Sequence, residues 1–294
     1  MKFRIIVIVL LCFCKNVEAQ DPIFSQYFLI PETLNPGFSG FMETTYAGII
    51  HRTQWPELDL KISTQYAFLN TYNDRMNSSY GLSILNQHEN NTSYNHSQLN
   101  FNYAYKVRLD RDWYFKPGIE IGYGLKSYAF QNLVLADQIN IGNGTINTSS
   151  IDPILLNDKV TFFDFTAGLL FHNENTWIAL SAKHLNNPNI AFTVNGNVPL
   201  STFYSINAGY EFLLADYVDV LFFPFSTKML VSANYMQQGD YNRFDLVTSF
   251  MFENLFLGAM AVTNPAKNNN NSHLLTSVNL FAGVQIEGLR AGVS

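Results

Sequence analysis

The sequence predicts an all-β fold, an antiparallel transmembrane β-barrel, and three observations support this prediction. Apolar side chains recur at every second position in many segments, a period that gathers them on one face of a strand. Aromatic residues make up 15% of the chain, whereas charged residues make up only 14%, against about 25% in average soluble domains. The faces between the apolar positions carry mainly Asn, Gly and Thr, as the interior of a membrane barrel does. A soluble β-sandwich is the alternative, but it would normally expose more charge.

The composition excludes two classes of protein. Intrinsic disorder requires low hydrophobicity and high charge, but 47% of the residues are hydrophobic. The 17 Lys and Arg residues are outnumbered by 23 Asp and Glu residues, so no basic field is available to bind nucleic acid. No later segment approaches 18 consecutive apolar residues, so no transmembrane helix is expected.

Residues 1–19 are predicted to be a signal peptide. Lys2 and Arg4 precede an apolar run over residues 5–14, and Val17 and Ala19 are small residues that favour cleavage before Gln20. Ten apolar residues are too few to span a bilayer of about 30 Å. Both cysteines of the chain lie within this run, so residues 20–294 offer no disulfide, cysteine metal site or thiol nucleophile.

Residues 20–40 are expected to lie at or across the barrel mouth, before the first strand. Asp21 and Asn35 each precede a proline, which disfavours helix because the preceding residue is pushed to extended conformations. Phe24 and Tyr27 are apolar or aromatic but stand outside any alternating pattern. Two interpretations remain open: a fixed surface that a partner recognises, or an ordinary packed plug. Residues 41–294 are then the barrel domain.

The alternation is clearest over residues 99–109 and 113–125, where the odd positions are apolar or aromatic. If both apolar sets share one face, the loop between them has an odd length. Placing Leu109 opposite Trp113 leaves a three-residue turn of a common hairpin class. This register faces Lys106 towards Lys116 and Asn102 towards Glu120 on the polar side.

Segments of the same kind recur along the chain and predict about thirteen strands. Breaks rich in Asn, Gly, Asp and Pro separate them, as turns require. Two longer interruptions, 130–159 and 185–200, are expected to be surface loops or small lids. The predicted strands are 41–55, 59–71, 79–87, 93–109, 113–130, 160–172, 175–184, 201–213, 227–238, 240–252, 254–263, 273–285 and 288–294.

No arrangement of residues indicates an enzyme. Asp164, Glu120 and Lys183 fall on predicted inward faces, where charges tolerated in a wet lumen are favoured over acid–base catalysis. His88 and His96 lie eight residues apart in a predicted Asn-rich loop, where solvated loop residues are favoured over a metal site. We therefore expect no catalytic residue, no metal and no cofactor.

Several motifs resemble those of the PorP/SprF family of Bacteroidota outer-membrane proteins. Residues 20–27 read Gln-Asp-Pro-Ile-Phe-Ser-Gln-Tyr, and Pro31, residues 34–37 and Gly40 follow with the family's spacing. Gly37 stands where the family usually has Ala, and residues 51–56 carry His51 and Thr53 in place of Tyr and Asn. Residues 180–189, 208–210 and 223–228 resemble later family segments. The candidate structural or partner-contact residues are Asp21, Pro22, Phe24, Ser25, Gln26, Tyr27, Pro31, Leu34, Asn35, Pro36, Gly40, Arg52, Gln54, Trp55, His184 and Pro188.

The resemblance implies an outer-membrane barrel of about 14 strands that serves the type IX secretion system. By this resemblance the chain contacts outer-membrane lipid and docks a secreted adhesin or gliding-type protein through that protein's C-terminal domain. Other secretion-system components are further expected partners, and nucleic acid is not. An outer-membrane porin or a transporter of small molecules or lipids is the alternative function. The family continues beyond a segment like residues 289–294 into one more strand, so we expect a sequence truncated at its C-terminus that inserts poorly.

Overall fold

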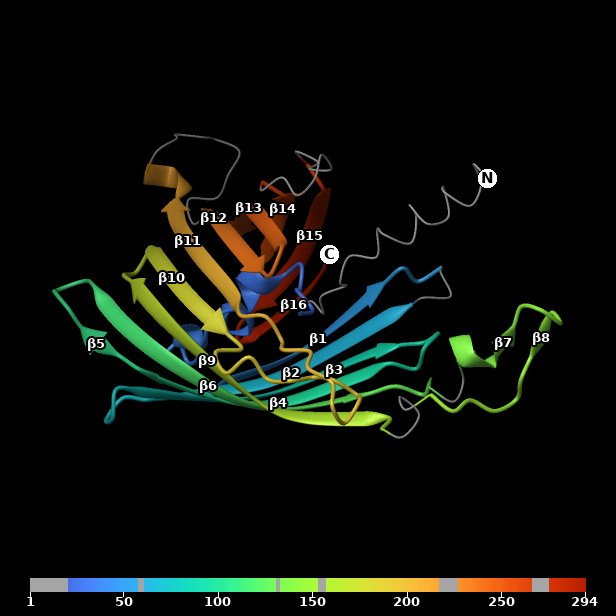
Figure 1. Cartoon of the computed structure of the whole chain (residues 1–294). Coiled ribbons are helices and arrows are strands. Elements are labelled where there is room, and N and C mark those ends of the chain that lie inside the picture. The colour runs from blue at the N-terminus through green and yellow to red at the C-terminus, as the bar shows by residue number, and fades with distance from the viewer. Residues whose placement is uncertain (1–20, 58–60, 131–132, 153–156, 217–226, 266–274) are drawn as a thin grey trace.

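The computed structural model describes residues 21–57, 61–130, 133–152, 157–216, 227–265 and 275–294 (Figure 1). The predicted signal peptide, residues 1–19, lies outside the described residues. No helix among the described residues has the length and apolar character needed to cross a membrane.

One antiparallel sheet makes up most of the molecule, and its strands follow one another in chain order. The short β5 extends the edge of β6, and β7 and β8 form a separate small hairpin. The strands of the sheet are β1 (Tyr46–Gln54), β2 (Ile62–Asn73), β3 (Ser78–Glu89), β4 (Asn95–Tyr105), β5 (Val107–Arg108), β6 (Tyr114–Ser127), β9 (Lys159–His172), β10 (Thr176–Lys183), β11 (Phe203–Leu213), β12 (Lys228–Gln238), β13 (Tyr241–Phe252), β14 (Leu255–Thr263), β15 (Ser277–Ile286) and β16 (Leu289–Val293). The small hairpin is β7 (Ile139–Asn140) and β8 (Thr145–Ile146), and short 3-10 turns cover Ala136–Gln138 and Leu214–Asp216.

Each predicted strand has its counterpart, and the predicted register of the central hairpin is confirmed. Asn102 pairs with Glu120, and the N–H of Leu109 donates to the carbonyl of Trp113 at 2.9 Å. Most strand boundaries differ from the prediction by a few residues, and two differences stand out. Residues 41–45 form turns rather than the start of the first strand, and the predicted strand 93–109 is interrupted at Lys106. The backbone N–H of Lys106 donates to the carbonyl of Asn77 just before β3, and β5 continues in the same register with β6.

The two faces of the sheet have opposite polarity, as a membrane barrel requires. On β4 and β6 the polar residues face the concave side, where Asn102 is 1% exposed. The apolar residues face outwards, and Ile121 and Tyr123 keep nearly half of their surface accessible. A sandwich would bury this apolar face, so the arrangement confirms the barrel prediction and excludes the sandwich.

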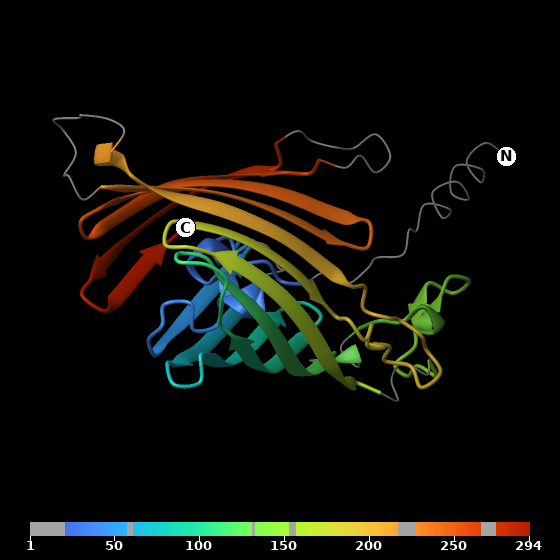
Figure 2. The ribbon, with the colours of Figure 1, turned by 90° about the vertical axis from the view of Figure 1, so that its left-hand side faces the viewer.

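The sheet curls round on itself but is not closed. Figures 1 and 2 show β1 to β6 and β11 to β15 as two walls joined through β9 and β10. Within the described residues, β1 pairs only with β2, and β16 pairs only with β15. The two edge strands run in the same direction, because an even number of antiparallel pairings separates them.

Residues 21–43, which we call the N-terminal segment, lie along the concave face. They form three 3-10 turns, η1 (Tyr27–Leu29), η2 (Pro31–Thr33) and η3 (Pro36–Phe38), and the last contacts β4, β6 and β9. A proline opens η2 and η3, where its fixed φ is compatible with a helical turn. The largest apolar cluster sits between this segment and the sheet, and it contains Tyr27, Leu34, Phe203, Met236 and Phe281.

The outward face predicts how charge substitutions will act. We expect Ile121→Lys, in the middle of β6, to lower the free energy of unfolding by about 2–4 kcal/mol, because the ammonium group enters hydrocarbon. Leu109→Lys, at the end of the same hairpin, should cost only about 0–1 kcal/mol near the interface. Urea titration of the protein folded into lipid vesicles measures both values, and equal losses would contradict the outward orientation of β6.

Candidate functional site

The N-terminal segment begins at a buried ionic cluster beside the C-terminal end of β10. His184 Nε2 lies 2.8 Å from Asp21 Oδ2, and His184 Nδ1 lies 2.9 Å from Asp164 Oδ2. The backbone N–H of Asp21 also donates to the side-chain oxygen of Gln238, at the end of β12, at 3.0 Å. The imidazole therefore bridges a carboxylate of the segment and a carboxylate of the sheet.

Electrostatics favour the charged form of both Asp21 and His184. Burial opposes charge on each group, but the mutual attraction and hydrogen bond outweigh it. The pKa of Asp21 consequently lies well below its ordinary value, with Lys183 and His96 contributing. Asp21 and Asp164 raise the pKa of His184 to about 9. At neutral pH the imidazolium donates from both nitrogens to the two carboxylates.

Asn35 fixes the middle of the segment to β9 and β10. Its side-chain nitrogen donates to the carbonyls of Leu169, at 3.2 Å, and Leu180, at 2.9 Å, which are partners across the ladder. Its side-chain oxygen accepts the N–H of Gly37 at 2.8 Å. The Ser181 hydroxyl donates to the carbonyl of Leu34 at 2.7 Å. Asn35 is buried, so these bonds satisfy an amide that has no access to water.

Two glycines of the sheet make room for the turn that contains Asn35. Gly118 of β6 and Gly168 of β9 are direct partners in the ladder. A Cβ atom on Gly118 would lie 2.5 Å from the backbone nitrogen of Gly37, and one on Gly168 would lie 2.0 Å from Asn35 Oδ1. Neither position therefore accepts a side chain while the segment stays in place.

Further polar contacts hold both ends of the segment. Arg52 of β1 donates to the carbonyl of Ile23 at 2.7 Å. The buried Lys116 donates to the carbonyl of Ser39 at 3.1 Å. Asn70 donates to the carboxylate of Glu32 at 2.8 Å, and burial raises the pKa of Glu32 to about 7.

The structure brings most of the candidate residues predicted from the sequence into this contact network. Phe24 packs against Tyr66 of β2, and the Ser25 hydroxyl lies 3.1 Å from that of Ser294. Gln26, Pro31 and Pro36 flank or open the 3-10 turns, and Gly40 adopts a positive φ beside Ser79. Pro22 lines the small cavity next to His184.

Three candidate residues lie outside the network in the described part of the chain. Gln54 ends β1, and Trp55 follows it with about half of its side chain exposed. Pro188 belongs to the loop after β10, where its carbonyl accepts the N–H of Leu200.

Sequence reasoning placed some charged residues correctly and missed others. Asp164 and Glu120 lie on the concave face as predicted, and both are buried. The prediction that His88 and His96 lie in a solvated loop is wrong, because they belong to β3 and β4, and His96 is 5% exposed. Gly118, Gly168 and Lys116 were not singled out as contacts of the segment. Glycines at inward positions of two neighbouring strands are a signal for such a close approach, but strands contain glycine for many reasons.

The loops that follow β6 and β10 form a second surface, at the C-terminal end of both strands. Phe192 contacts the rings of Tyr128 and Phe130 with centroids 5.3 and 5.4 Å apart, so the loop after β6 packs on the loop after β10. Ile190 and Leu200 are buried against Phe162 of β9. We call residues 128–130, 133–152 and 184–202 the loop platform. Among the described residues, no group of three or more His, Asp or Glu side chains is placed to hold a metal ion.

The model of one protein family, described as the type IX secretion system membrane protein PorP/SprF, matches residues 16–294. The chain belongs to the PorP/SprF family. Family membership and the barrel fold place it in the outer membrane, and the family is one of secretion-system membrane proteins rather than enzymes.

Solved outer-membrane proteins show distant likeness to the chain. A KdgM porin is 10% identical with a TM-score of 0.33, covering 74% of this chain and 88% of its own. Outer membrane phospholipase A from Escherichia coli is 12% identical with a TM-score of 0.38, covering 85% and 97%. A mutant of the Rh. blastica porin is 9% identical with a TM-score of 0.33, covering 84% and 93%. No curated protein sequence matches the chain.

Gly118 and Gly168 leave the space that Asn35 occupies, which we call its seat, and substitution of a glycine tests this seat. Gly168→Ala should lower the free energy of unfolding by about 1–3 kcal/mol, because the added methyl group displaces Asn35 or its strand. Gly142→Ala, in an open loop position, is the matched control and should leave stability unchanged. Urea titration in lipid vesicles measures both, and a neutral Gly168→Ala would contradict the seat.

The ionic cluster predicts how the segment responds to pH. The raised pKa of His184 means that its contribution is complete below its ordinary value of 6.5 and is lost as pH rises through about 9. The lowered pKa of Asp21 means that its contribution is complete above its ordinary value of 3.8 and is lost in stronger acid. A spin label on Ser25→Cys should therefore become more mobile above about pH 9.

The thiol at position 25 is unique in residues 20–294, which contain no other cysteine. Adding His184→Gln should make the label mobile at every pH, because the buried charge pair is gone. The exposed His88→Gln is the control and should keep the wild-type profile. A flat profile in the chain with native His184 would show that the cluster does not hold the segment.

Proposed function

We propose that the chain is a non-enzymatic barrel of the type IX secretion system that holds a secreted partner at the cell surface through the partner's C-terminal domain. The proposal rests on membership of the PorP/SprF family and on the loop platform. The loop platform is the observation that carries the docking role, because it combines exposed apolar side chains with a lack of Lys and Arg.

The loop platform presents apolar side chains that nothing within the described residues covers. Ile141 and Ile151 are each 92% exposed, and Val194 is 80% exposed. The sequence ranges 128–158 and 184–202 contain no Lys or Arg. Large apolar side chains left exposed on protruding loops are a feature of surfaces that bind another protein. Figure 1 shows the β7–β8 hairpin projecting well beyond the strands, where a partner has access to it.

The lengths of the connections orient the barrel. Successive connections of an antiparallel meander alternate between its two ends, so residues 74–77, 173–175 and 253–254 are short turns at one end. We call it the turn end, although it also carries the longer connection 214–227. The loop platform lies at the opposite end. Outer-membrane barrels have short periplasmic turns and longer extracellular loops, which puts the loop platform on the cell-surface side.

The N-terminal segment lies inside the curved sheet and occupies part of its interior. We assign residues 20–40 the role of a plug, which contacts the end of the barrel that carries the loop platform through Asp21 and His184. Its contacts with the concave face disfavour the alternative function, an open porin. Its buried hydrogen bonds to the sheet fix the segment in the space through which a porin substrate would pass.

The docking role predicts the effect of charging the loop platform. Ile141→Asp combined with Ile151→Asp should reduce, by about fivefold or more, the amount of a reporter carrying a type IX cargo C-terminal domain that stays on the cell surface, because each charge would be buried in the complex. Surface labelling of intact cells measures the reporter. Met76→Asp, exposed in a turn at the opposite end, is the control. Unchanged retention in the double variant, with normal barrel levels in the membrane, would overturn the proposed docking surface.

A further inference from the structure

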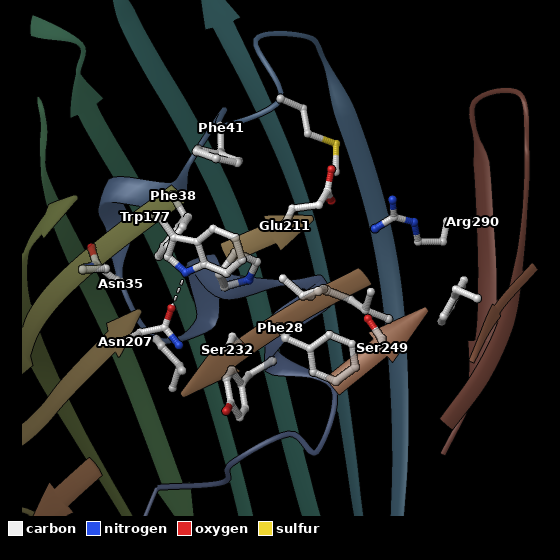
Figure 3. A pocket seen from close by; sticks show the side chains of 18 of the residues that line it. Phe28, Asn35, Phe38, Phe41, Trp177, Asn207, Glu211, Ser232, Ser249 and Arg290 are labelled. Atoms are coloured by element: carbon white, nitrogen blue, oxygen red, sulfur yellow. Dashed lines mark hydrogen bonds between the residues drawn. The ribbon is translucent and has the colours of Figure 1, made fainter. Parts of the chain in front are cut away.

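A cavity of about 230 Å³ lies between the N-terminal segment and the strands β10 to β14 (Figure 3). Its walls are largely aromatic and aliphatic. Phe28, Phe38 and Phe41 come from the segment, and Trp177, Leu230 and Phe256 come from the sheet. Several of these residues stand near the turn end of their strands, so the cavity is separate from the loop platform.

The polar side chains in the wall are largely bonded to the protein itself. The indole N–H of Trp177 donates to the side-chain oxygen of Asn207 at 2.6 Å, as Figure 3 shows, and Asn207 donates to a backbone carbonyl. Asn35 is bonded to β9 and β10, and the Ser205 hydroxyl donates to Asn234. An occupant therefore meets mainly apolar surface in the interior.

Charged groups gather at one side of this cavity and leave a net positive charge. Lys228 Nζ lies 2.6 Å from a carboxylate oxygen of Glu211, so these two charges compensate each other. Arg290 of β16 also lines the cavity, and its guanidinium donates to the neutral amide of Gln285. The two cations and one anion thus favour an anionic group on the occupant.

The volume restricts the occupant to one narrow apolar group. A cavity of roughly 150 Å³ lined by apolar side chains binds benzene, so 230 Å³ admits a larger apolar group. Pockets for drug-sized ligands start at about 300 Å³, which excludes a bulky ligand or a two-chain lipid.

We propose that this cavity binds a single-chain anionic amphiphile of the fatty acid class. The acyl chain lies among Phe28, Trp177, Leu230 and Phe256, and the carboxylate pairs with Arg290 beside the Lys228–Glu211 ion pair. This binding site does not depend on docking of a secreted partner, because it lies away from the loop platform.

Trp177 provides the readout, because it is one of three tryptophans and lies in the cavity wall. The test uses the full-length protein with Trp55→Phe and Trp113→Phe, reconstituted in phosphatidylcholine nanodiscs. Titration with 6-bromohexanoic acid, whose short chain suits the cavity volume, should quench Trp177 saturably, because bromine quenches on contact. A chain that keeps only the partly exposed Trp113 reports partition of the acid into the lipid and should show unsaturable quenching.

Two cavity-filling variants keep the proposal falsifiable. Ser232→Leu fills the cavity and costs no hydrogen bond, since Ser232 Oγ has no partner among the described residues. Ser249→Phe fills the cavity from β13. Whichever of them retains the circular dichroism spectrum of the parent should lose saturable quenching. Saturable quenching that survives in a folded variant of either kind, or unsaturable quenching of Trp177 in the parent, would overturn the site.

A separate variant tests the role of the Arg290 charge in the cavity. Arg290→Gln should weaken binding of the bromo acid by about tenfold or more, because a charged hydrogen bond is lost. Binding of the neutral 6-bromohexanol should stay within about twofold, because the apolar wall is intact. Equal affinities of the acid for the parent and for Arg290→Gln would contradict the anionic head group.

Discussion

The polar concave face of the sheet is the constraint on which the rest of the structure depends. A sheet that turns its apolar side chains to lipid must turn its polar ones inwards, and buried polar groups are costly unless they are hydrogen-bonded. Here the N-terminal segment supplies many of the missing partners. It offers the carboxylates of Asp21 and Glu32, the amide of Asn35 and the carbonyls of Ile23, Leu34 and Ser39. At these positions the segment and the sheet satisfy each other's polar groups.

Buried charged groups near the loop platform are also paired between the segment and the sheet. Asp21 and Asp164 would repel each other inside a barrel of low dielectric constant, and His184 between them turns that repulsion into two charged hydrogen bonds. A buried ion pair contributes modestly to net stability, but removal of one partner leaves a buried charge unpaired and is strongly destabilising. The cluster therefore specifies where the segment begins more than it stabilises the fold.

The sequence predicted the strands well because alternation is local. Odd and even positions over residues 99–125 determined both faces and, with the three-residue turn, the pairing of Asn102 with Glu120. The interruption at Lys106 was not predicted, because the alternation of apolar and polar residues continues through this position. Asp21 and His184 were both singled out from motifs, but no pattern within one segment could show that they meet. The seat formed by Gly118 and Gly168 was missed for the same reason: it exists only once β6 and β9 are paired under Asn35.

The path of the N-terminal segment has a consequence for the order of assembly. Asp21 is held beside the ends of β10 and β12, whereas Ser39 contacts Lys116 near the opposite end of β6. The segment therefore runs the length of the interior, between walls that are far apart in the chain. Threading it into a finished cylinder would require stripping water from many polar groups in a narrow space. Wrapping the strands around a segment that is already in place avoids this cost, so we expect the N-terminal segment to act as a template on which the later strands assemble.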